Sequence, residues 1–182
     1  MAEDPAERST CGLELTACEM AKSLILELRE RSQTLALAES CTAGLVADLL
    51  AGVPGASQVL WGSFVCYTAV AKCAMLGLDR QRLEQYGLVS VETACDMALG
   101  ALAKSGASLA AAITGLAGPD GDGSAVPVGT VWVATARRGS TNALPREFHF
   151  QGSRNEVRMQ AALAALEELL ARDRILDKLR GN

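Results

Sequence analysis

Two short runs of small and aliphatic residues, at positions 35–38 and 109–113, each follow a segment in which apolar residues recur at helical spacing. A short continuous apolar run is typical of a strand that is buried on both faces of its sheet. Such a sheet needs helices against both faces, because each face would otherwise be exposed to water. The sequence therefore predicts an α/β fold, a three-layer α/β/α sandwich in which a mixed sheet is flanked by helices on both faces.

The other segments complete this architecture. Helices are expected at 11–31, from Ser40 or Thr42 to residue 50, at 69–76, 79–86 and 91–104, and from Ser153 onward. Further strands are expected at 58–68, 129–136 and 146–151, and the last two should pair antiparallel because a short polar segment joins them. The Gly/Pro/Asp-rich loop at 114–128 is of a kind that is usually functional or mobile.

The chain of 182 residues is long enough for one domain with a substantial core. The acidic and polar residues 1–10 are expected to form a disordered tail, and residues 11–180 a single domain. No apolar run is long enough to span a membrane, and the start does not resemble a secretory signal, so we expect a cytoplasmic protein. The net charge of −4 and the lack of a large basic patch argue against nucleic acid as a partner.

The six cysteines contain no C-x-x-C pair and no histidines lie near them. This pattern favours reduced thiols over a zinc site or a disulfide framework. We therefore expect neither a metal nor a cofactor.

Ser40 lies in the sequence ESCTAG at 39–44, where a strand is expected to turn into a helix. Backbone N–H groups at a helix N-terminus are free to bind an oxyanion, and those near Cys41 and Thr42 are the candidates. Ser40 is therefore a candidate nucleophile, although a serine here can equally be a simple helix cap. Cys41 is a second candidate, because a helix N-terminus lowers the pKa of a thiol.

A serine nucleophile needs a base. The only histidine, His149, lies in a strand with nothing in its neighbourhood that favours catalysis. Lys72 is a better candidate, since apolar residues surround it and burial would lower the pKa of its amine into a useful range. The alternative is a lysine whose stem packs while its ammonium reaches water.

Two further polar clusters follow. The glycines in TGLAGPDGDG at 114–123 let backbone approach a ligand, although the sequence is neither a Walker A nor an EF-hand loop and can also be a flexible surface loop. Arg154 and Arg158 share one face at the start of the last helix, where they can clamp a phosphate or pair with acids such as Glu156.

These motifs, in this order, resemble the CinA C-terminal domain family over roughly residues 15–170. The series is ESCTAG at 39–44, Tyr67 with Lys72 five residues later, GLVS at 87–90, TGLAGP at 114–119, PVGTV at 127–131 and GSR at 152–154.

The resemblance implies a metal-free serine amidase that hydrolyses the carboxamide of nicotinamide mononucleotide to nicotinic acid mononucleotide and ammonia. It implies that Ser40 attacks the amide carbon, that Lys72 takes and returns the proton, and that Tyr67 holds or relays within that pair. The residues that it assigns to substrate binding are Thr42, Gly44, Thr114, Gly115, Ala117, Gly118, Arg154 and Arg158, with the arginines on the 5′-phosphate. A homo-oligomer is common among such small amidases.

The chain departs from the family pattern at Ala43, Ala69, Asp122 and Val126, where the family usually has Gly, Asn, Gly and Lys. These changes leave two alternatives open: a catalytically silent nucleotide-binding paralogue of the same fold, and a Ser/Lys amidase or esterase for another small substrate.

Overall fold

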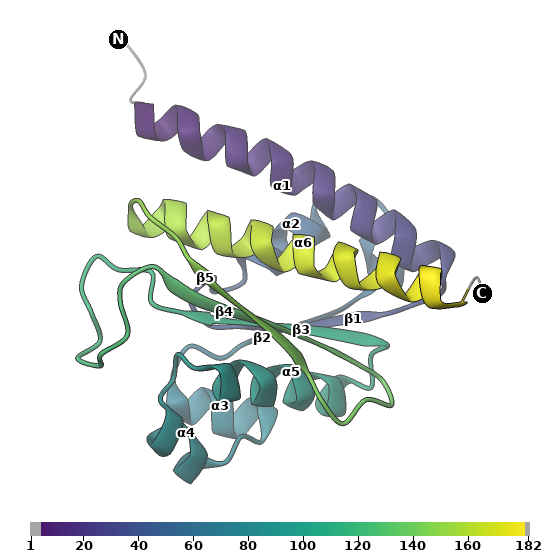
Figure 1. The fold of residues 1–182 in the computed structure, drawn as a ribbon. Coiled ribbons are helices and arrows are strands. Elements are labelled where there is room, and N and C mark those ends of the chain that lie inside the picture. The colour runs from purple at the N-terminus through teal and green to yellow at the C-terminus, as the bar shows by residue number, and fades with distance from the viewer. Residues whose placement is uncertain (1–4, 181–182) are drawn as a thin grey trace.

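The protein is a three-layer α/β/α sandwich around a five-stranded mixed sheet (Figure 1). The structure, a computed structural model, describes the backbone of residues 5–180 and the side chains of residues 12–172. The sheet order is β2-β1-β3-β4-β5, with β2, β1 and β3 parallel and the last two strands antiparallel. The strands are β1 (Leu35–Glu39), β2 (Leu60–Val65), β3 (Leu109–Gly115), β4 (Thr130–Arg137) and β5 (Leu144–His149).

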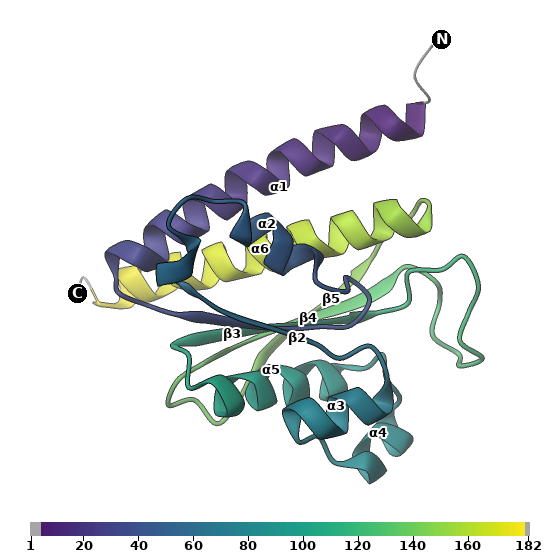
Figure 2. The same ribbon diagram turned by 180° about the vertical axis from the view of Figure 1, so that it is seen from behind.

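Helices cover both faces of the sheet, as Figure 2 shows from behind. One face carries α1 (Pro5–Glu30), α2 (Leu45–Ala51) and α6 (Arg154–Arg180); the other carries α3 (Ala69–Leu76), α4 (Arg80–Tyr86) and α5 (Val91–Ser105). A short 3-10 helix, η1 (Ala56–Gln58), precedes β2. The predicted fold class is confirmed, as is the antiparallel pairing of the last two strands.

The two central strands separate two apolar cores. On the α1 and α6 side, β1 contributes Leu35 and Leu37 to the core. On the α5 side, the same strand presents Ala38, and β3 presents Ala110 and Ala112. Because alanine methyl groups are short, α5 can pack close to the sheet, which explains how a chain with few aromatic residues fills its interior.

Several element boundaries differ from the prediction. Helix α1 begins at Pro5, inside the segment expected to be a disordered tail, and proline is favourable in the first turn of a helix; residues 1–4 lie outside the described residues. Strand β2 is shorter at both ends than the predicted 58–68, because η1 ends at Gln58 and Thr68 caps α3. Helix α2 begins at Leu45, well after Ser40.

The fold places the polar clusters at one edge of the sheet. Ser40 directly follows β1, Cys66 follows β2, and the loop at 116–129 follows β3. Because these strands are parallel, their carboxyl ends lie together. The connection from β1 to β2 carries α2 on one face, and the connection from β2 to β3 carries α3 to α5 on the other face. Open α/β sheets bind ligands at such a change of direction.

Candidate active site

Ser40 is the first residue of a tight turn that links β1 to α2. Its backbone N–H donates to the carbonyl of Ile113 on β3 at 2.9 Å, and its own carbonyl accepts from the Ala43 N–H at 3.1 Å. The side chain is 8% exposed. The serine is therefore held by the neighbouring strand, with a small part of its surface open to the cavity described below.

The prediction that α2 starts at Ser40 or Thr42 is wrong, because the helix is capped by Gly44. Ala43 and Gly44 both have left-handed backbone, with φ of 52° and 95°. Two consecutive left-handed residues reverse the chain before the helix begins, so Ser40 is not a helix cap. Residues 40–44 are called the nucleophile turn below.

A buried carboxylate that the sequence analysis did not single out holds this turn. Glu39 is fully buried, and its Oε2 accepts from the N–H groups of Gly44 and Val46 at 2.9 and 3.1 Å. Its Oε1 accepts from the Ala47 N–H and the Ser63 hydroxyl, both at 3.0 Å. The sequence signal was an acidic residue ending a wholly apolar strand, since a buried charge is rare without partners.

Glu39 therefore occupies the N–H groups at the start of α2, which can no longer bind an oxyanion. The N–H groups of Cys41 and Thr42 precede the helix, and they donate to no backbone carbonyl within the described residues. Thr42 is fully buried and its hydroxyl has no hydrogen-bond partner. The candidate oxyanion donors thus lie in the turn itself, beside Ser40.

Lys72 is completely buried on α3. Its Nζ donates to the carbonyl oxygen of Cys66 at 3.1 Å and contacts Met97 Sδ at 3.4 Å. Burial lowers the pKa of this amine, while the thiols of Cys66 and Cys41 raise it slightly. The alternative in which its ammonium reaches water is excluded, and the amine has the environment that a general base requires.

The Lys72 amine is linked to the start of the nucleophile turn through Cys66. Cys66, which receives its hydrogen bond, donates its own N–H to the Glu39 carbonyl at 2.9 Å, one residue before Ser40. The charge of Lys72 also acts on the neighbouring Cys41 thiol. Among the described residues, Nζ bonds to the Cys66 carbonyl and to Met97 Sδ and not to Ser40.

Burial raises the pKa of the Cys41 thiol to about 11, against the small lowering effect of Lys72. The expectation that a helix N-terminus would lower this pKa is wrong, because Cys41 lies in the core rather than at the start of α2. A thiol that stays protonated is a poor nucleophile, so Ser40 is the better candidate.

A cavity of about 180 Å³ opens beside Ser40. Of the residues predicted for the site, those that line it are Ser40, Tyr67, Thr114, Gly115, Ala117 and Arg154. The lining also includes residues that the sequence analysis did not assign to substrate: Cys41, Leu88, Val89, Leu116 and Asp122. Five of the predicted residues do not line the cavity: Lys72, Thr42, Gly44, Gly118 and Arg158.

Arg154 connects three parts of the site. Its guanidinium donates to the Tyr67 hydroxyl at 2.5 Å and to the Gly118 carbonyl at 2.6 Å. Its suggested partner Glu156 is bonded to the N–H and hydroxyl of Ser153 in a capping box instead. Arg154 therefore joins the start of α6, Tyr67 in the segment after β2, and the glycine-rich loop at one point on the cavity wall.

The side chains of Thr114 and Arg158 both donate hydrogen bonds to backbone carbonyls. The Thr114 hydroxyl donates to the Leu88 carbonyl at 2.7 Å, which joins the end of β3 to the segment before α5. The Arg158 guanidinium donates to the carbonyls of Cys41 and Thr42. His149 lies exposed on the edge strand β5, where its contacts are Thr130 and Glu147.

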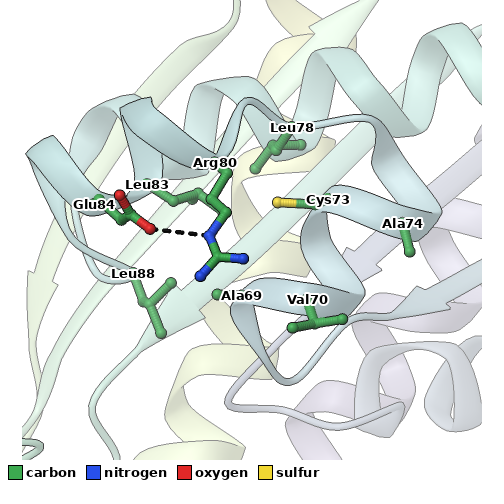
Figure 3. A pocket seen from close by; sticks show the side chains of 9 residues that line it. All are labelled: Ala69, Val70, Cys73, Ala74, Leu78, Arg80, Leu83, Glu84 and Leu88. Carbon is green, nitrogen blue, oxygen red and sulfur yellow. Dashed lines mark hydrogen bonds and ion pairs between the residues drawn. The ribbon is translucent and has the colours of Figure 1, made fainter.

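A larger cavity of about 610 Å³ lies between α3 and α4 (Figure 3). Its wall is mostly aliphatic, and its charged pair, Arg80 and Glu84, is an exposed helix ion pair. It shares Leu88 with the smaller cavity. Since Ser40 lines the smaller cavity and not the larger one, the smaller cavity is the candidate active site.

Other chemistry is limited in the described part of the chain. Among those residues, no group of three or more His, Cys, Asp or Glu could hold a metal ion. No helix there is long and apolar enough to cross a membrane. The described cysteine side chains Cys18, Cys41, Cys66, Cys73 and Cys95 are free thiols.

The fold and site together define an α/β/α protein with a serine at a strand-to-helix turn and a buried lysine that is linked to the start of this turn through Cys66. The chain belongs to the CinA family, because the profile of the CinA C-terminal domain matches residues 17–172. The resemblance stated from the motifs is thereby confirmed.

Relatives differ in length. A CinA-like protein of Syntrophomonas wolfei is 43% identical over 78% of this chain, but the chain spans only 34% of that protein. Nicotinamide-nucleotide amidohydrolase PncC of Enterobacter agglomerans is 38% identical over 84% of this chain and 92% of its own length. The crystal structure of competence/damage inducible protein CihA from Agrobacterium tumefaciens has a TM-score of 0.82 and 38% identity, with 94% of this chain and 98% of that chain covered.

The nucleophile turn yields a stability prediction. Ala43 is exposed and left-handed. Ala43→Gly should raise the free energy of unfolding by about 0.5–1 kcal/mol, since left-handed backbone strains alanine but not glycine. Urea unfolding of both proteins measures this difference. Ala51→Gly, at an exposed right-handed position of α2, is the control and should not stabilise. If Ala43→Gly and Ala51→Gly destabilise the protein equally, the backbone of Ala43 is not strained.

The buried amine yields a pH prediction. Since the pKa of Lys72 is lowered in the folded state, the unfolded chain binds more protons between that pKa and 10.5. The free energy of unfolding should therefore rise with pH across this window, and the rise should shrink in Lys72→Met. Urea unfolding at a series of pH values tests this, with exposed Lys104→Met as the control. Identical slopes in wild type and Lys72→Met would contradict it.

Proposed function

We propose that this chain is a nicotinamide-nucleotide amidase, which hydrolyses the carboxamide of nicotinamide mononucleotide to nicotinic acid mononucleotide and ammonia. The observation that carries the proposal is the fully buried Lys72 amine, which is linked to the start of the nucleophile turn through Cys66. A buried amine without a carboxylate partner is costly, and such groups concentrate at active sites. The choice of substrate rests on the name of one relative, nicotinamide-nucleotide amidohydrolase PncC.

In the proposed first step the Ser40 hydroxyl oxygen attacks the carboxamide carbon while neutral Lys72 takes its proton. The resulting oxyanion accepts hydrogen bonds from the Cys41 and Thr42 N–H groups. The Lys72 ammonium then gives its proton to the departing nitrogen, so that ammonia leaves and an acyl ester on Ser40 remains. In the second step water attacks that ester, Lys72 again moves the proton, and the free carboxylate is released.

Charge sets the orientation of the substrate. Arg154 lines the cavity and is the candidate ligand of the 5′-phosphate, because a guanidinium binds phosphate in a fork. Phosphate binding would have to compete with its bonds to Tyr67 and Gly118. Tyr67 lines the same cavity as Ser40 and bonds to Arg154. It is proposed to hold the positions of Lys72 and Ser40 through the segment after β2.

A silent nucleotide-binding paralogue is the second candidate, favoured by two departures at the site. Ala43 strains the nucleophile turn, and Asp122 adds a carboxylate to the cavity wall. This candidate predicts that the mononucleotide raises the melting temperature while no ammonia appears on long incubation. A Ser/Lys amidase or esterase for another substrate would instead release product from a different member of a panel of small amides and esters.

We also propose that the protein works in the cytoplasm and as a homo-oligomer. Trp61 and Val65, on the edge strand β2, are about half exposed, which suits an apolar contact between copies. Light scattering after gel filtration measures the mass in solution, and a monomer mass at micromolar concentration would contradict the oligomer.

The mechanism predicts that Ser40→Ala and Lys72→Ala each reduce kcat by at least about 10³-fold, as in enzymes that lose a member of a nucleophile–base pair. Ammonia release from nicotinamide mononucleotide, without added metal, is the measurement. Circular dichroism verifies folding, and Ser140→Ala and Lys104→Met are matched controls on exposed residues. Full turnover in a folded Ser40→Ala or Lys72→Ala protein would remove the proposed pair.

Arg154 is expected to act on the phosphate. Arg154→Met should raise KM for nicotinamide mononucleotide about 10- to 100-fold, the effect of losing a charged hydrogen bond. The nucleoside without the 5′-phosphate should be hydrolysed by wild type and Arg154→Met with similar KM. If KM rises equally for the nucleotide and the nucleoside in Arg154→Met, Arg154 does not bind the phosphate.

A further inference from the structure

Arg158 lies on α6 one turn after Arg154, but its guanidinium faces the nucleophile turn. Nε donates to the Cys41 carbonyl at 3.2 Å, and one terminal nitrogen donates to the Thr42 carbonyl at 3.0 Å. The other terminal nitrogen donates to Asn155 Oδ1 at 3.3 Å. The guanidinium thus holds two consecutive carbonyls with one edge, and it does not line the cavity that Arg154 lines.

Each carbonyl belongs to the same rigid peptide unit as the N–H of the next residue. The Cys41 carbonyl is therefore coupled to the Thr42 N–H, and the Thr42 carbonyl to the Ala43 N–H. A cation that binds a peptide carbonyl fixes the plane of that peptide and polarises its N–H group. The Thr42 N–H is a candidate oxyanion donor of the proposed amidase and donates to no backbone carbonyl in the described chain.

We propose that Arg158 is a positioning residue: by binding the Cys41 and Thr42 carbonyls, it orients and polarises the Thr42 N–H that stabilises the oxyanion on the Ser40 adduct. This inference rests on the proposed serine chemistry and deepens it. It also gives different roles to the two arginines that the sequence analysis assigned to the phosphate. Arg154 lines the substrate cavity, whereas Arg158 bonds to the backbone of the turn.

The surroundings of Arg158 support this role. The turn contains two left-handed residues, Ala43 and Gly44, so its geometry needs support from outside. Glu39 holds the N–H groups on the α2 side of the turn, and Arg158 holds carbonyls on the Ser40 side. A guanidinium is suited to this position, because its planar edge presents two parallel donors whereas an ammonium is a single point charge.

The test compares Arg158→Met and Arg158→Lys with wild type on nicotinamide mononucleotide and on the nucleoside without phosphate. We expect kcat to fall about 10- to 100-fold in Arg158→Met on both substrates with KM little changed, since misplaced oxyanion donors cost rate rather than binding. Arg158→Lys should stay slow, because one ammonium cannot hold both carbonyls. Arg172→Met, on the same helix and away from the turn, is the control.

A loss that is larger for the phosphate-bearing substrate, or that falls on KM alone, would show that Arg158 binds phosphate and would overturn the proposal. Full activity of Arg158→Lys would overturn the two-carbonyl role. Melting temperatures within a few degrees of wild type, with a rate loss, separate positioning from unfolding; should Arg158→Met not fold, Arg158→Lys carries the test.

A second measurement does not depend on the substrate. When a fluorophosphonate reacts, its phosphorus bonds to Ser40 Oγ, the P–F bond breaks to release fluoride, and the Ser40 hydroxyl proton passes to Lys72. The phosphoryl oxygen then occupies the oxyanion site. Mass spectrometry should show slower labelling of Ser40 in Arg158→Met than in wild type or Arg172→Met. Labelling without hydrolysis of the mononucleotide would refute the nucleotide substrate and leave this proposal standing. Equal labelling rates in the three proteins, or no labelling of wild type, would overturn it.

Discussion

The carboxylate of Glu39 is the interaction on which the geometry of the site depends. One buried side chain accepts three N–H groups from the start of α2 and the hydroxyl of Ser63 on β2. It thereby joins β1, the nucleophile turn and the neighbouring strand. Because hydrogen bonds to a charge are strong and an unpaired buried charge is very unfavourable, these elements have few alternative arrangements.

The buried amine of Lys72 is connected to the backbone of Glu39 through Cys66. Its bond to the Cys66 carbonyl and the bond of the Cys66 N–H to Glu39 form a chain from the amine to the residue before Ser40. Burial between α3, α5 and the sheet lowers the pKa of the amine. A buried amine costs stability, and this is the property that the proposed role of Lys72 as a base would use.

The sequence alone was sufficient for the fold class and for most elements. Apolar runs at β1 and β3 required cover on both faces, and the signals at Asp79 and Ser90 marked helix starts that the structure confirms with side-chain caps. It failed at the start of α2, where Ser40 has the chemistry of a cap. Local propensity does not reveal that Glu39 folds back to bind the helix N-terminus, because that bond depends on burial between neighbouring strands.

Local sequence singled out Ser40 and Arg154, and the family resemblance added Tyr67 and Thr114; the fold brings all four to one cavity. Tertiary structure alone decided the roles of groups whose partners lie far along the chain. It removed the Lys72 amine from water, raised the pKa of the Cys41 thiol, and turned Arg158 toward carbonyls 116 and 117 residues away. Residue type and spacing determine which chemistry is available; burial and direction, which only packing sets, determine which groups can use it.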